Sequence, residues 1–154
     1  MELSSLIIPT GLAYPGTTVA ELFSECVKAD VQGIPFRDAN GNIVGKASIR
    51  HVLKENCIPD FMVQHAHLLG DKIQHLLIPD NYVCEVLSLP IDDFILSTMA
   101  VATSATPITK AIAIMENMDA TYLFIIDDGV YKGIVSIMGI AQAMLQIQRQ
   151  SDVD

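Results

Sequence analysis

The stretch GKASIRH at residues 45–51 returns 88 positions later as GIVSIMG at residues 133–139. Each copy runs from a glycine through a short strand-like pair to Ser-Ile, and then enters an apolar helical pattern. Ser48 in the first copy and Ser136 in the second stand where a helix N-cap is expected. The same junction written twice indicates that the chain contains an internal duplication.

The similarity extends upstream of this junction. A shift of 89 positions aligns residues 17–38 with residues 106–127 and places Asp30 on Asp119. The shift becomes 88 after one residue is lost in a turn, where a duplicated chain tolerates a deletion best. Because the apolar positions keep step throughout, both halves are expected to carry the same elements.

Each half is expected to fold as strand, helix, strand, strand, helix. The opening strands would be IIP at residues 7–9 and VAT at residues 101–103. Thr18 with Glu21 predicts a capping box at the first helix of repeat 1, and Thr106 is the corresponding capping hydroxyl in repeat 2. Because so small a half cannot bury both faces of its sheet, the halves should pack sheet face to sheet face.

A connector that matches neither half lies between them. The predicted organisation is repeat 1 at residues 1–57, a helical connector at residues 58–94 and repeat 2 at residues 95–154, together one α+β (mixed α/β) module. Within the connector, a helix is expected to start at Pro59. Its apolar face would consist of Met62, Leu69, Ile73 and Leu76.

The composition excludes several classes of protein. The 154 residues include 18 acidic and 9 basic ones, a formal charge of −9, without the basic run that nucleic acid or an anionic membrane surface selects. The most apolar stretch, residues 94–115, is interrupted by Pro107 and Lys110, so no membrane insertion is expected. The three cysteines show no CxxC spacing and the first basic residue is Lys28, which favours the cytoplasm. Cys26 falls on an apolar helix face and should be inert.

Motifs for catalysis and metal binding are not evident. The sequence contains no GxSxG, P-loop, HExxH or GxGxxG motif, so an enzyme is the least favoured class. The connector histidines His65, His67 and His75 suggest a metal-dependent enzyme as a third alternative. However, His65 and His67 diverge on a helix, and Asp71 with His75 would supply only two ligands, so no metal site is expected.

Residues 33–53, GIPFRDANGNIVGKASIRHVL, and residues 122–144, YLFIIDDGVYKGIVSIMGIAQAM, follow one order of signals. Both resemble the signature of cystathionine-β-synthase (CBS) domains: an apolar run, an acidic turn, a glycine, a strand, a serine or threonine, and a helix. The resemblance covers residues 8–54 and 95–147 and points to a free-standing tandem CBS pair, or Bateman module. It implies two subdomains, each a three-stranded sheet with two helices, packed about a pseudo-two-fold axis with two clefts.

The resemblance also implies that the clefts bind adenine nucleotides. Adenine would lie against residues 33–35 or residues 122–124, and the serine of each junction would reach a phosphate. In nucleotide-binding members an aspartate three residues past this serine holds the ribose. Here His51 and Gly139 stand at that place; a neutral imidazole offers one acceptor at most and glycine offers none.

Basic residues favour the first cleft, since Lys46, Arg50 and Lys54 surround Ser48, whereas only Lys132 lies near the second serine. The first-choice ligand site is therefore Thr17, Gly33, Ile34, Pro35, Ser48, Arg50 and His51. The weaker set is Thr103, Tyr122, Leu123, Phe124 and Ser136. A protonated His51 would strengthen phosphate binding at mildly acidic pH.

Simpler structural explanations exist for several of these residues. The serines can be plain helix caps, Pro35 can mark a tight strand entry, and Arg50 with Lys54 can form a solvated helix face. The favoured function is regulatory energy sensing: AMP, ADP or ATP, or a related phosphorylated metabolite, occupies a cleft of a homodimer that relays occupancy to a regulated enzyme or transporter. The alternative is a ligand-free module that acts through homodimerisation and partner docking.

Overall fold

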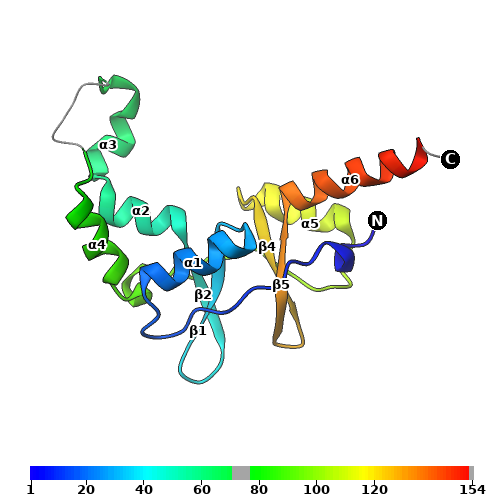
Figure 1. The fold of residues 1–154 in the computed structure, drawn as a ribbon. Helices are drawn as coiled ribbons and strands as arrows, with labels where there is room; N and C mark the ends of the chain where they lie inside the picture. The colour runs from blue at the N-terminus through cyan, green and yellow to red at the C-terminus, as the bar shows by residue number, and fades with distance from the viewer. Residues whose placement is uncertain (71–76, 153–154) are drawn as a thin grey trace.

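The computed structural model describes residues 1–70 and 77–152. Two halves stand side by side, each with a small sheet and its own helices (Figure 1). The first half contains α1 (Val19–Ala29), β1 (Gly33–Arg37), β2 (Ile43–Ser48) and α2 (Ile49–Cys57). The second contains β3 (Val101–Ala102), α5 (Ile108–Asn117), β4 (Tyr122–Asp127), β5 (Val130–Ser136) and α6 (Ile137–Ser151). Short 3-10 turns, η1 (Leu3–Leu6) and η4 (Ile91–Phe94), precede each half.

Local side-chain chemistry sets where the first helix of each half begins. The hydroxyl of Thr18 accepts the N–H of Glu21 at 3.2 Å, and the carboxylate of Glu21 accepts the N–H of Thr18 at 3.1 Å, so the capping box is confirmed. The cap expected at Thr106 is wrong. Its hydroxyl accepts the N–H of Thr103 at 3.0 Å, within the preceding turn, and α5 begins after Pro107 without a side-chain cap.

The sheets contain the two predicted hairpins. β1 pairs antiparallel with β2, and β4 pairs antiparallel with β5. β3 pairs parallel with β4, which confirms VAT as the opening strand of the second repeat. In the first repeat the equivalent pairing is a single bridge between Ala13 and Phe36, so the first sheet has two strands and one bridge in place of three strands.

The opening strand expected at residues 7–9 is wrong, because this segment pairs with the other repeat. Ile8 forms an antiparallel bridge with Ile134, with N–H···O distances of 2.8 and 2.9 Å. Leu96, 88 positions after Ile8, pairs with Lys46 in the same way at 2.8 and 3.0 Å. Each repeat thus receives its edge strand from the segment ahead of the other repeat. This reciprocity is what a pseudo-two-fold axis requires.

Two buried clusters form the core, and the repeats share one of them. The first is built around α1 and includes Leu22, together with Phe124 and Ile134 from the second repeat. The second includes Leu123 and also Leu3 from the N-terminal segment. Because successive side chains of a strand point to opposite faces, β4 is buried on both sides. The repeats therefore pack sheet face to sheet face.

The connector is less regular than the sequence pattern predicts. α3 (Asp60–His65) begins after a proline as expected, but η2 (Ala66–Leu68) follows it and Leu69 is extended, so one continuous apolar helix face does not form. Its other predicted members, Ile73 and Leu76, lie outside the described residues. α4 (Asp80–Ser88) begins after Pro79.

The end of the connector joins the first core, where Val86 and Ile91 are buried. Within residues 1–70 and 77–152, no helix combines the length and the apolar character that a membrane crossing needs.

Candidate functional site

Ser48 and Ser136 each end a strand and cap the helix that follows. The hydroxyl of Ser48 accepts the N–H of His51 at 3.1 Å, and that of Ser136 accepts the N–H of Gly139 at 3.0 Å. Both predicted N-caps are therefore confirmed. The first amides of a helix lack intrahelical partners. Here the N–H of Ile49 bonds to the carbonyl of Gln32 at 3.0 Å and that of Ile137 to the carbonyl of Thr121 at 2.9 Å, so part of the donor capacity of each junction is already used and what remains suits a polar ligand atom.

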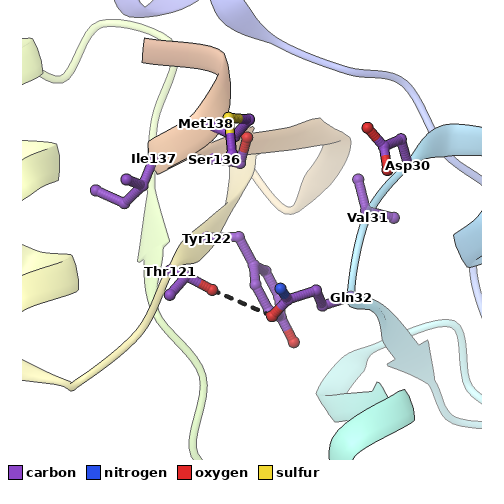
Figure 2. A pocket seen from close by; sticks show the side chains of 8 residues that line it. All are labelled: Asp30, Val31, Gln32, Thr121, Tyr122, Ser136, Ile137 and Met138. Atoms are coloured by element: carbon purple, nitrogen blue, oxygen red, sulfur yellow. Dashed lines mark hydrogen bonds between the residues drawn. The ribbon is translucent and has the colours of Figure 1, made fainter. Parts of the chain in front are cut away.

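A cavity of about 340 Å³ lies beside the second of these serines. Figure 2 shows its two sides: the turn between α1 and β1, and the junction of β5 with α6. The residues that line it are Asp30, Val31, Gln32, Thr121, Tyr122, Ser136, Ile137 and Met138. Of the predicted ligand-binding residues, Tyr122 and Ser136 are among them. We call this space the Ser136 cavity.

Residues of both repeats line the Ser136 cavity. The hydroxyl of Thr121 donates to the side-chain oxygen of Gln32 at 3.2 Å (Figure 2). The 89-residue shift places Gln32 on Thr121, so this bond joins equivalent residues across the pseudo-two-fold axis. The cavity therefore lies between the repeats, where the CBS resemblance implies a cleft.

Tyr122 extends from the second repeat toward the first-half junction. A Cβ atom added at Gly33 would collide with the Tyr122 hydroxyl, so the tyrosine occupies the space that this glycine leaves. The ammonium group of Lys46 lies 5.4 Å from the ring centroid, within the range of a cation–π contact. Burial raises the pKa of Tyr122 to about 12.

The first-choice residues around Ser48 are not among those that line the Ser136 cavity. Gly33, Ile34 and Pro35 are buried within β1. The buried hydroxyl of Thr17 accepts the N–H of Tyr14 at 3.1 Å.

Near Ser48, the side chain of His51 lies beside Glu55 and that of Lys46 lies beside Tyr122. Nδ1 of His51 lies 4.0 Å from a carboxylate oxygen of Glu55, one helical turn away. Burial, followed by the nearby charge of Arg50, lowers the pKa of Lys46. Arg50 is exposed. The phosphate-binding role expected of His51 stays a prediction.

The other three residues of the weaker set do not line the Ser136 cavity either. Leu123 and Phe124 are fully buried on opposite faces of β4, where they support the sheet. Thr103 is exposed, and its N–H bonds to Thr106.

Asp30 lines the Ser136 cavity and was missed by the sequence analysis. It follows the last residue of α1 in the left-handed conformation, with φ 55°, and Asp119, two residues past the end of α5, has the same conformation with φ 50°. Aspartate tolerates this region better than most residues. The identity of Asp30 and Asp119 in the repeat alignment is the signal that could have found it.

Metal binding finds no support in the part of the chain that the structure describes, because no group of three or more His, Cys, Asp or Glu side chains gathers there. Asp71 and His75 lie outside that part, so the connector proposal is not tested for them.

Comparisons with known proteins agree with this geometry. Residues 88–146 match the family model of the CBS domain. The CBS-pair protein CBSX2 from Arabidopsis thaliana is 20% identical, with a TM-score of 0.66 over 96% of this chain and 96% of that chain. A CBS domain-containing protein of unknown function from Bacillus anthracis is 15% identical, with a TM-score of 0.63 over 95% and 94% of the two chains. A comparison with curated protein sequences found no match.

Residues 88–146 are therefore a CBS domain, and the whole chain has the fold of a tandem CBS pair.

Proposed function

We propose that this protein is a regulatory CBS pair that binds an adenosine-containing ligand in the Ser136 cavity and relays its occupancy to a protein partner. The observation that carries the proposal is the cavity of about 340 Å³ between the repeats, beside a helix-capping serine and an aromatic ring. In support, a structure of CBSX2 in complex with AMP shares the fold, with 19% identity and a TM-score of 0.60 over 96% of this chain and 98% of that chain.

The lining of the Ser136 cavity suits a nucleoside. Tyr122 offers a half-buried aromatic surface on which a base can stack. Ser136 accepts one hydrogen bond from the helix and keeps its own proton to donate to a ligand. The volume lies at the lower end of the range for small-molecule sites, roughly 300–1,000 Å³, so it suits a single nucleoside-sized ligand.

The first-half junction favours the alternative function, in which a cleft holds side chains and no ligand. There Tyr122 fills the space above Gly33 and contacts Lys46. We therefore place one ligand per chain, at Ser136, although the basic residues favour Ser48. If the Ser136 cavity were also empty in solution, the protein would act through dimerisation and docking alone.

The proposed setting is a cytoplasmic homodimer that controls an enzyme or transporter. The three cysteines are free, and Met138, Met144 and Leu145 leave apolar surface exposed along α6. Light scattering on the purified chain would show twice the mass of a monomer, and a monomer at micromolar concentration would contradict the dimer.

Two matched cap variants test the site. Ser136→Ala and Ser48→Ala remove equivalent caps, so each should lower stability by about 1 kcal/mol. Thermal melts with adenosine, AMP, ADP and ATP should show a ligand-dependent rise in Tm for the wild type with at least one of them, because binding stabilises the folded state by RT ln(1 + [L]/Kd). Ser136→Ala should weaken this rise and Ser48→Ala should leave it intact.

The outcomes separate the two functions. A rise that disappears equally in both variants, or only in Ser48→Ala, would move the ligand away from the Ser136 cavity. The absence of any rise at millimolar ligand would favour the ligand-free module.

A further inference from the structure

The Ser136 cavity is lined by a carboxylate and by no cationic side chain. Of its eight lining residues, Asp30 is the one that carries charge at neutral pH. Lys46 and Arg50, the cations expected to hold a phosphate, lie at the other junction and are absent from the lining. Phosphate groups are bound most strongly by arginine and lysine, so this lining does not suit a phosphorylated ligand.

Asp30 is held in place by its backbone and leaves its carboxylate for a ligand. Its N–H bonds to the carbonyls of Cys26 and Val27 at the end of α1, which fixes the residue. Neither ion pair in the described part of the chain includes it. In Figure 2, Asp30 and Val31 stand on the side of the cavity opposite Ser136.

The opposite wall lacks a carboxylate that could hold the ribose. Gly139 stands three residues past Ser136 and supplies no side chain, although its N–H bonds to the Ser136 hydroxyl. A ribose diol presents two O–H donors, and an ionised carboxylate is an acceptor with two oxygens that can receive both. Asp30 is the side chain of this lining with that chemistry.

We propose that Asp30 accepts hydrogen bonds from the ribose diol of the ligand in the Ser136 cavity, and that this ligand is a nucleoside whose 5′ substituent is neutral or cationic. The proposal rests on the proposed function, because it concerns the same cavity. A 5′-phosphate would place negative charge beside the carboxylate of Asp30, on a chain whose formal charge is already −9. The site therefore selects against nucleotides.

The repeat supplies a matched control. Asp119 has the same left-handed backbone after α5 and is not among the residues that line the Ser136 cavity. Asparagine tolerates this conformation as well as aspartate does, so Asp30→Asn and Asp119→Asn should both fold. The two variants remove the same charge and differ in their distance from the ligand.

Calorimetric titration with adenosine, 2′,3′-dideoxyadenosine and AMP tests both parts of the proposal. The wild type should bind adenosine about tenfold or more tightly than dideoxyadenosine, and tenfold or more tightly than AMP, as expected for charge-assisted hydrogen bonds. In Asp30→Asn both preferences should shrink severalfold, since an amide keeps one acceptor oxygen but loses the charge. Asp119→Asn should keep both within about twofold.

Three results would overturn the inference. If AMP binds the wild type more tightly than adenosine, the ligand is a nucleotide. If Asp30→Asn keeps the preference for adenosine over dideoxyadenosine, Asp30 does not hold the ribose, and the Ser136 cavity remains the site. If the wild type binds none of the three probes at millimolar concentration, the proposed function fails together with the inference.

Discussion

At the scale of single residues, burial controls the reactivity of Cys26. Its side chain lies on the buried face of α1, and burial, aided by the charge of Glu25, raises the pKa of the thiol to about 11. The thiolate is the reactive form, so Cys26 should not react with Ellman's reagent at pH 8 until the protein unfolds. Cys84 is exposed and should react first. A Cys84→Ser variant should lack the fast phase, and rapid labelling of Cys26 in the native protein would show that the core opens.

Two half-buried tyrosines predict a loss of stability at alkaline pH. Burial raises the pKa of Tyr122 and of Tyr131 to about 12. Because the folded state then binds the phenolic proton more tightly than the unfolded chain, whose pKa is about 10, stability is complete below pH 10 and declines as pH rises toward 12. Between pH 10 and 11 the decline should be roughly 1 kcal/mol for each tyrosine.

Urea denaturation at pH 9, 10 and 11 measures this decline. Tyr122→Phe and Tyr131→Phe should each flatten the pH dependence, while a phenylalanine at Tyr14, which is half exposed, should leave it unchanged. An identical slope in all three variants would assign the alkaline decline to other groups.

At the scale of elements, the pairing of each edge segment with the other repeat depends on a glycine in the strand that it contacts. A Cβ atom at Gly45 would collide with the carbonyl of Leu96, and one at Gly133 with the carbonyl of Ile8. Gly45→Ala should therefore lower the free energy of unfolding by about 1–3 kcal/mol, because the edge segment must move away from its hydrogen bonds. Gly70→Ala is the matched control, since a Cβ there meets no atom of the described residues within 4 Å. A Gly45→Ala protein as stable as this control would show that the edge pairing is loose.

The elements that were predicted correctly from the sequence are those determined by residues close together in the chain. The capping box at Thr18 and the caps at Ser48 and Ser136 depend on residues within one turn, and each hairpin depends on the turn that joins its strands. The opening strand at residues 7–9 was assigned to the wrong sheet because Ile8 pairs 126 positions away, with Ile134. An apolar tripeptide can extend either sheet, and only the assembled fold decides between them.

At the scale of the whole molecule, the candidate site could not be predicted from the sequence for the same reason, because it depends on contacts between segments far apart in the chain. The resemblance to CBS pairs implied two clefts, and the basic residues favoured the first. What distinguishes the clefts is a side chain from the opposite repeat: Tyr122 reaches the space above Gly33, and Asp30 reaches the Ser136 cavity. A one-dimensional alignment places Tyr122 on Gly33 but does not show that Tyr122 lines the Ser136 cavity and also fills the space at Gly33.

The shared core predicts that the two repeats unfold together. Phe124 belongs to the second repeat but is buried in the cluster built around α1, whereas its neighbour Leu123 is buried in the second cluster; both are fully inaccessible. Phe124→Ala should lower stability by about 3–5 kcal/mol and Leu123→Ala by about 2–5 kcal/mol, through lost burial and the cavities left behind. The two truncations therefore cost similar amounts but act on different clusters.

Hydrogen exchange followed by mass spectrometry shows which of the two clusters each truncation weakens. Phe124→Ala should speed amide exchange in both α1 and β5, because the cluster that joins the repeats contains Leu22 of α1 and Ile134 of β5. Leu123→Ala should speed exchange mainly in α5 and α6, whose side chains Met115 and Ile140 pack in the second cluster. If Phe124→Ala left α1 as protected as in the wild type, the repeats would be independent units. A ligand held between them could then not bias both at once, so relay from the Ser136 cavity to a partner requires the coupled result.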